Sequence, residues 1–138
     1  MTLDQARARA TFPVLTPESL GPLGRVEVSD GGRVVTLLYP PTTARSSVRI
    51  DESGQSLQPF FTKFIDPQLA EQVDVGGYRG LWVRRPHDVA YVDASGRILP
   101  ETVRLAPATL VWQHGAVTLR MEGFATLKEA LAVAAAFR

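Results

Sequence analysis

Polar and apolar residues alternate along several short stretches of the chain, and the alternation is cleanest near its C-terminal end. The strand predicted at residues 116–121 shows this best. In an extended chain, Val117, Leu119 and Met121 would lie on one side, and Thr118, Arg120 and the following Glu122 would lie on the other. A repeat of two is typical of a β-strand with one face in the core and one in water. We therefore expect this strand to bury its apolar side and to expose its polar side.

Turns rich in glycine separate these stretches, as Asp30-Gly31-Gly32 does between two of them. A strand, a glycine turn and a second strand predict a hairpin. Three hairpins are expected, which pair residues 25–28 with 34–39, 48–51 with 57–65, and 109–112 with 116–121. Further strands are expected at residues 78–83, 89–92 and 103–105.

Helical spacing of apolar residues is confined to short segments. Residues 3–10 predict a short helix, and residues 66–72 another, with Asp66 as its N-cap and Pro67 at its first position. The closing helix has the strongest signal, because Thr126 and Glu129 form a capping-box pattern ahead of a stripe of small and apolar residues. Together the elements predict an α+β fold, in which a short N-terminal helix and a C-terminal helix pack on a curved antiparallel sheet of about seven to eight strands.

Composition indicates one globular domain over residues 1–138. The chain is 45% hydrophobic and 21% charged, and its net charge of +1 is too small to favour nucleic acid. The absence of cysteine excludes disulfides and thiolate chemistry. No apolar run has the length of a spanning helix, and no signal peptide opens the chain. A membrane-anchored parent protein would therefore carry its anchor in another segment, which makes this chain a fragment of it.

Few residues suggest chemistry, and we expect no catalytic residue, metal or cofactor. The two histidines, His87 and His114, both lie in predicted turns, and neither has the partners that a catalytic triad requires. Acidic residues stand singly, and no phosphate-binding glycine motif occurs. One turn invites a second interpretation: Arg84, Arg85 and His87 form either an anion-binding turn or a solvated hairpin corner.

Aromatic residues on the predicted strands leave two interpretations open. They are core residues, or they line an apolar groove between sheet and helix that accepts a lipid or another apolar ligand. Neighbouring residues of a strand point to opposite faces, so some large side chains must leave the principal core face. The candidate ligand-binding residues are Tyr39, Phe61, Trp82 and Trp112.

Four stretches of the chain carry a family resemblance: residues 8–17, which contain Phe12-Pro13-Val14, residues 76–87, which contain Trp82 and end in Pro86-His87, residues 109–122, and the helix over residues 126–134. In this order they resemble an uncharacterised domain family of the extracytoplasmic parts of bacterial anti-sigma factors and of lipoprotein-sorting-like membrane-anchored proteins. Two departures stand out: Leu119 replaces a frequent tyrosine, and the segment between Ile65 and Val75 is short.

The resemblance implies placement outside the cytoplasmic membrane and a sensory or interaction role. The family has no established catalytic residues, so none is carried over to this chain. The leading hypothesis is a non-enzymatic extracytoplasmic sensor or protein-interaction domain of a membrane-anchored regulator. The alternative is a carrier of a lipid or other apolar ligand in a groove between sheet and helix; an enzyme is the least favoured class.

Overall fold

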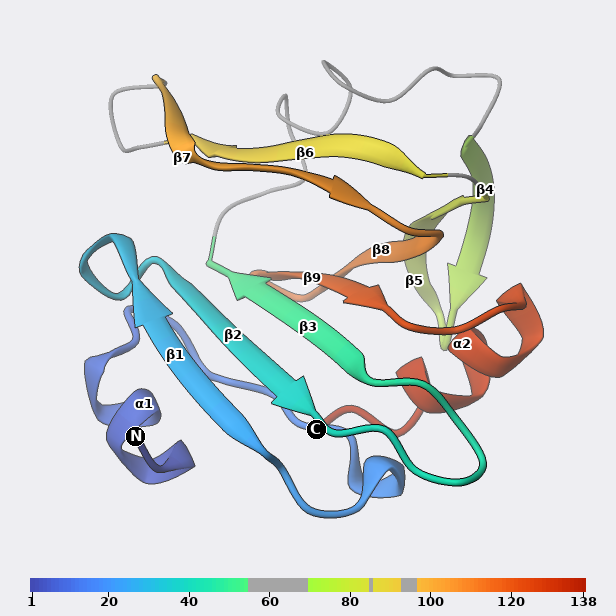
Figure 1. Cartoon of the computed structure of the whole chain (residues 1–138), viewed down its shortest axis with the longest axis horizontal. Coiled ribbons are helices and arrows are strands. Elements are labelled where there is room, and N and C mark those ends of the chain that lie inside the picture. The colour runs from blue at the N-terminus through green and yellow to red at the C-terminus, as the bar shows by residue number, and fades with distance from the viewer. Residues whose placement is uncertain (55–69, 85, 93–96) are drawn as a thin grey trace.

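The computed structural model describes residues 1–54, 70–84, 86–92 and 97–138, and it confirms the α+β class (Figure 1). Seven strands form one antiparallel sheet in the order β1-β2-β3-β9-β8-β5-β4. These strands are β1 (Arg25–Ser29), β2 (Val34–Tyr39), β3 (Val48–Ser53), β4 (Ala70–Val75), β5 (Tyr78–Val83), β8 (Thr109–His114) and β9 (Val117–Glu122). A two-stranded sheet contains β6 (His87–Val92) and β7 (Ile98–Ala106).

The described residues contain two α-helices, and both begin with a threonine cap. Helix α1 (Leu3–Arg9) has a capping box between Thr2 and Gln5, and α2 (Leu127–Ala134) begins where the Thr126 hydroxyl accepts a hydrogen bond from the Glu129 amide. Two short 3-10 turns, η1 (Glu18–Leu20) and η2 (Asp30–Gly32), complete the described elements.

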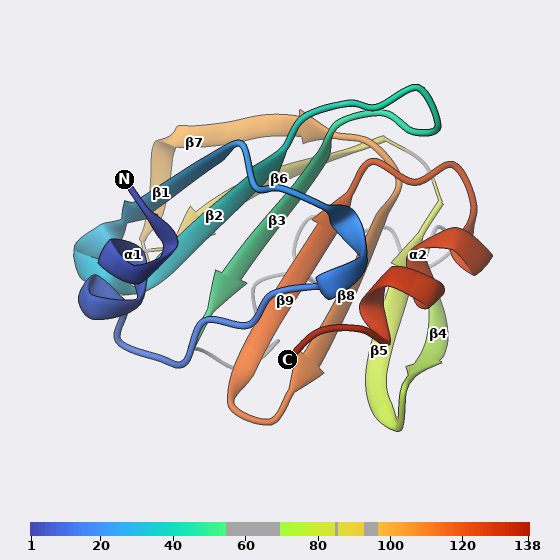
Figure 2. The same cartoon turned by 90° about the horizontal axis from the view of Figure 1, so that it is seen from below.

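One face of the large sheet holds the apolar core. Both helices, η1 and the two chain ends lie on this side, as Figure 2 shows from below. The strands supply alternate residues to this core, which is the period of two expected for a pleated sheet. Its fully buried strand side chains include Val35, Leu37, Ile50, Leu110, Trp112 and Leu119. We refer to this side as the apolar face.

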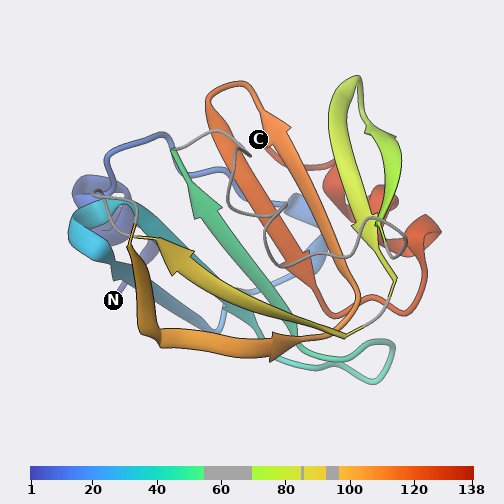
Figure 3. The same cartoon turned by 90° about the horizontal axis from the view of Figure 1, so that it is seen from above.

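The opposite side, here the polar face, is also buried along β9, which contradicts the expectation that the polar side of this strand meets water. Thr118, Arg120 and Glu122 are between 2% and 5% exposed. Figures 1 and 3 show the β6–β7 sheet lying over this side of the large sheet. Because a second layer covers the polar face, the alternation in β9 separates two buried environments and not core from solvent.

Register aligns the polar face into rows that cross the sheet. One row runs from Arg25 through Leu38 and Arg49 to Glu122. The next row runs through Thr36, Asp51 and Arg120. Neighbouring strands lie about 4.8 Å apart, so charges on adjacent strands of a row are within reach of one another.

Several local predictions are confirmed, and others are wrong. The hairpins β1–β2 and β8–β9 and the turn at Gly76-Gly77 form as expected. Of the helix predicted over residues 66–72, residues 66–69 lie outside the described residues, and residues 70–72 belong to strand β4, because they pair with β5. Residues 57–65, the predicted hairpin partner of β3, lie outside the described residues; β3 itself pairs with β2 on one side and β9 on the other.

The two histidines also lie in strands and not at the centres of turns. His87 is the first residue of β6, and His114 is the last residue of β8, where its ring stacks on Tyr78 with 4.2 Å between ring centroids. Strand β7, predicted over three residues, extends over Ile98–Ala106. Pairing with β6 stabilises this length, which the local sequence pattern does not show.

Candidate functional site

The middle of the polar face carries a buried network of charges centred on Asp51. Its carboxylate accepts hydrogen bonds from the Thr36 hydroxyl at 2.6 Å and from the Arg49 Nε at 2.9 Å. Burial opposes ionisation of Asp51, but the charge and hydrogen bonds of Arg49, with the Thr36 hydroxyl, outweigh it and lower the pKa of Asp51. Asp51 is therefore ionised at neutral pH, and it fixes the position of Arg49.

A second buried pair lies beside it on β9. Arg120 Nη2 lies 3.1 Å from Glu122 Oε1, and the two side chains are 3% and 6% exposed. The charge of Arg120 also favours the ionised form of Asp51. A buried charge is tolerated when it is paired and hydrogen-bonded, so these residues form one electrostatic unit.

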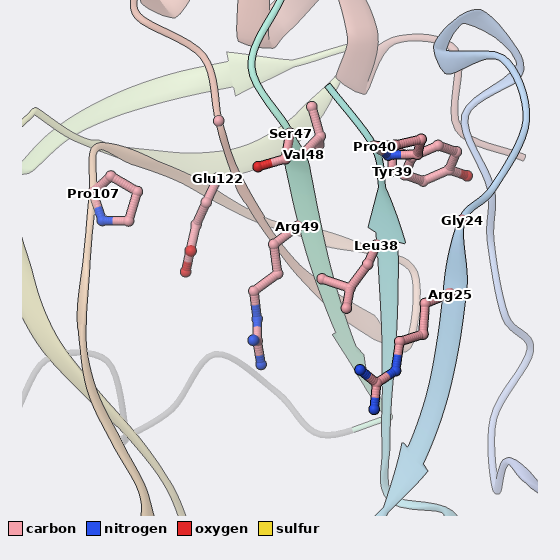
Figure 4. Close-up of a pocket in the computed structure, with 11 residues that line it drawn as sticks. Gly24, Arg25, Leu38, Tyr39, Pro40, Ser47, Val48, Arg49, Pro107 and Glu122 are labelled. Atoms are coloured by element: carbon pink, nitrogen blue, oxygen red, sulfur yellow. The ribbon is translucent and has the colours of Figure 1, made fainter. Parts of the chain in front are cut away.

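A pocket of about 470 Å³ opens at one end of this network (Figure 4). Its charged residues come from the row described above: Arg25 on β1, Arg49 on β3 and Glu122 on β9. Leu38 lies between the two arginines. The remaining lining residues are Gly24, Tyr39, Pro40, Ser47, Val48, Pro107 and Gly123. We call this site the row pocket.

The charges of the row pocket differ in their access to solvent. The Arg25 side chain is 70% exposed and the Arg49 side chain 32%, whereas their acidic neighbours Asp51 and Glu122 are 2% and 6% exposed. Glu27, which pairs with Arg25 at 2.6 Å, is 42% exposed. Positive groups therefore dominate the accessible charge of the pocket, although the negative charges beneath them balance the total.

Two glycines shape the wall of the row pocket. Gly123 has a φ of +123°, and a Cβ at this position would lie 2.3 Å from the Ser47 carbonyl oxygen. A Cβ on Gly24 would lie 3.1 Å from the Leu38 carbonyl oxygen, to which the Gly24 amide donates a hydrogen bond. Glycine is required at position 123 because both its backbone conformation and the close approach exclude a side chain.

The aromatic candidates do not gather at this site, apart from Tyr39. Tyr39 lines the row pocket but is only 3% exposed and belongs to the apolar core. Trp82 and Trp112 lie in the same core on the apolar face, where Trp112 packs edge-on against Phe137 with 5.1 Å between ring centroids. Phe61 lies outside the described residues. The three described side chains therefore fill the space between sheet and helices.

The predicted anion-binding turn is described only in part. Arg84 follows β5 and pairs with Glu71 at 3.7 Å, with both side chains about half exposed. Arg85 and the His87 side chain lie outside the described part, and His87 begins a strand. The anion-binding turn remains a prediction.

Sequence reasoning missed one unusual group, the Glu52 carboxyl on the apolar face. Its Oε1 accepts a hydrogen bond from the Leu15 amide at 2.8 Å, and its Oε2, also buried, has no hydrogen-bond partner among the described residues. Burial raises the pKa of Glu52 to about 8, against the smaller opposing effects of the Leu15 amide and Arg7. The signal was present, because a repeat of two from Val48 and Ile50 brings Glu52 to the apolar side; the hairpin predicted from residues 48–51 and 57–65 instead leaves Glu52 between its two strands.

Among the described residues, no three His, Asp or Glu side chains gather as a metal site would require. The helices in the described ranges are too short or too polar to cross a bilayer. A scan against protein-family models finds no match, and neither curated proteins nor solved structures show significant similarity to the chain. The resemblance to extracytoplasmic domains of anti-sigma factors therefore remains a prediction from the sequence.

Proposed function

We propose that this chain is a non-enzymatic binding domain that acts as the sensory or protein-interaction part of a membrane-anchored regulator, outside the cytoplasmic membrane. The row pocket is the observation that carries the proposal. It combines accessible guanidinium groups with apolar walls, which is the composition of many ligand sites. The extracytoplasmic setting comes from the sequence resemblance alone.

The buried network supports a role in binding over one in reaction chemistry. Asp51 is ionised and held by Arg49 and Thr36, and Glu122 is paired with Arg120. A general base must reach a substrate proton and is most effective with a pKa near the working pH. Asp51 meets neither condition, because it is buried and its pKa is lowered. These residues instead hold Arg49 in a fixed position at the pocket.

The alternative, a carrier with its ligand between sheet and helix, receives less support. Trp82 and Trp112 would line such a groove, and both are packed into the core, 6% and 0% exposed. A ligand there would have to displace side chains that already touch one another. We therefore place the binding site on the polar face.

A pair of chromosomal alleles in the source organism tests the sensory role. Arg25→Gln removes an exposed charge of the row pocket, and Arg79→Gln removes an exposed charge elsewhere on the sheet as the matched control. We expect Arg25→Gln, at unchanged protein level, to alter the transcripts of a discrete set of genes, and Arg79→Gln to leave them unchanged. Identical transcript profiles in both strains would rule out a sensory pocket.

Protease accessibility tests the location. An epitope inserted at the exposed Gly76-Gly77 turn of the native gene should not disturb the packed strands on either side. We expect external protease to remove the epitope from cells whose cytoplasmic membrane is intact. Protection of the epitope until the cells are lysed would place the domain in the cytoplasm and contradict the proposal.

A further inference from the structure

We infer that the row pocket binds a small carboxylate that carries an apolar body, with the carboxylate between Arg25 and Arg49 and the body along Leu38, Pro40 and Pro107. The inference rests on the proposed function and names the ligand class of its site. Its basis is the order of side chains on three adjacent strands: Arg25 on β1, the apolar Leu38 on β2 and Arg49 on β3.

The spacing of the two arginines fits a single anionic group. They lie two strands apart, about 10 Å between backbones at the usual strand separation. Figure 4 shows both side chains extending on the same side of the sheet, with Leu38 between them. Each guanidinium presents a planar set of donors that matches a carboxylate, so one carboxylate above Leu38 can accept hydrogen bonds from both.

The two arginines have different roles in this arrangement. Arg49 is preorganised, because its Nε is held by the buried Asp51 carboxylate. Arg25 is adaptable, because its partner Glu27 is exposed and exposed ion pairs contribute little stability. A ligand carboxylate therefore competes with Glu27 for Arg25 but leaves the Arg49–Asp51 pair intact.

The rest of the lining determines what accompanies the carboxylate. Leu38, Pro40 and Pro107 offer apolar contacts on the floor and sides of the pocket, whereas Val48, whose side chain lies in the core, lines it with its backbone. Glu122 lies on the strand beyond Arg49, so a second negative group on the ligand would meet a carboxylate there. Both features favour a monoanion with one apolar end over a small inorganic dianion.

Titration of the purified chain with four compounds tests the inference. Three of them share the same phenylpropyl group and differ in their polar end: 3-phenylpropanoate, 3-phenylpropan-1-ol and 3-phenylpropylammonium. The fourth is inorganic phosphate. Backbone amide NMR signals of Leu38, Val48 and Gly123 report on the pocket. We expect 3-phenylpropanoate to shift these signals, with the alcohol binding at least 10-fold more weakly and the ammonium ion and phosphate more weakly still. Equal binding of acid and alcohol, or shifts confined to other residues, would overturn the inference.

Variants give an independent readout on the same titration. Arg25→Gln should weaken 3-phenylpropanoate binding about 5-fold, and Glu27→Gln should strengthen it about 2-fold, because it removes the competitor for Arg25. Arg79→Gln is the control and should change nothing. If Arg25 acted only through its ion pair with Glu27, both substitutions would break that pair and weaken binding equally. Equal losses of 3-phenylpropanoate affinity in Arg25→Gln and Glu27→Gln would therefore also overturn the inference.

The outcomes separate this inference from the proposed function. Carboxylate binding without a transcript change in the Arg25→Gln strain leaves the ligand class intact and removes the sensory role. A transcript change without binding of 3-phenylpropanoate leaves the sensory role intact and removes this ligand class.

Discussion

Replacement of Glu52 by glutamine should remove most of the pH dependence of stability between pH 5 and pH 8. Glutamine has nearly the same shape, can still accept the hydrogen bond from the Leu15 amide, and stays neutral at every pH. Glu52 is fully buried, and its pKa is about 8 in the fold against an ordinary value of 4.5. Between these values the folded chain holds a proton that the unfolded chain releases.

The sign follows from this difference in proton binding. A raised pKa gives a contribution to stability that is complete below pH 4.5 and is lost as the pH rises through about 8. For a pKa of about 8 the loss between pH 5 and pH 7 is ~2.5 kcal/mol, and the full loss at high pH is ~5 kcal/mol. Asp51 does not interfere in this range, because its lowered pKa confines its effect to acid pH.

Urea unfolding at pH 5, 6, 7 and 8 measures the effect. We expect the free energy of unfolding of the native chain to fall by ~2.5 kcal/mol from pH 5 to pH 7 relative to Glu52→Gln. Glu18→Gln, which alters an exposed glutamate, serves as the control and should reproduce the native slope. Parallel pH profiles for the native chain and Glu52→Gln would refute the reasoning, because they would mean that Glu52 is ionised within the fold.

Three further substitutions test the fold around the row pocket and the last helix. Gly123→Ala should cost ~3 kcal/mol in urea unfolding, because its φ is +123° and the added Cβ would meet the Ser47 carbonyl; a loss under ~1 kcal/mol would contradict this. Asp51→Asn should flatten the loss of stability as pH falls below 3.8, measured by acid unfolding; an unchanged acid limb would mean that its pKa is not lowered. Thr126→Ala should cost ~1 kcal/mol through the lost cap, and a neutral result in thermal unfolding would contradict that.

The part of the fold that the sequence predicted is the part controlled by neighbours along the chain. The hairpin β8–β9 forms where Gly115 precedes an alternating run, and α2 begins after its N-cap Thr126, as the capping pattern indicates. Turn residues and caps act within four residues, so their signals can be read locally. The failed helix at residues 70–72 shows the limit: pairing with β5, which local propensity does not contain, makes this segment a strand.

The row pocket was beyond prediction for a related reason. Arg25, Arg49 and Glu122 are far apart in the sequence, and only the pairing of β3 with both β2 and β9 brings them into one row. The sequence suggested another basic cluster, Arg84, Arg85 and His87, because those residues are adjacent in the chain. Residues adjacent in the chain are easy to recognise, whereas residues adjacent across a sheet require the strand order.

The two faces of the large sheet accommodate buried acids in opposite ways, and this explains why the polar side of β9 is buried and not exposed to solvent. On the polar face Asp51 has Arg49 and Thr36 as partners, so it remains charged within a covered layer. On the apolar face Glu52 accepts a hydrogen bond from the Leu15 amide, and no cation of the described part of the chain is hydrogen-bonded to it, so it is neutral up to a pH of about 8. Polar residues on one side of a strand therefore indicate a solvent-exposed face only when the fold offers them no ion-pair or hydrogen-bond partner. Adjacent residues of one strand thus predict opposite responses to pH, with Asp51 weakening the fold in acid and Glu52 in base.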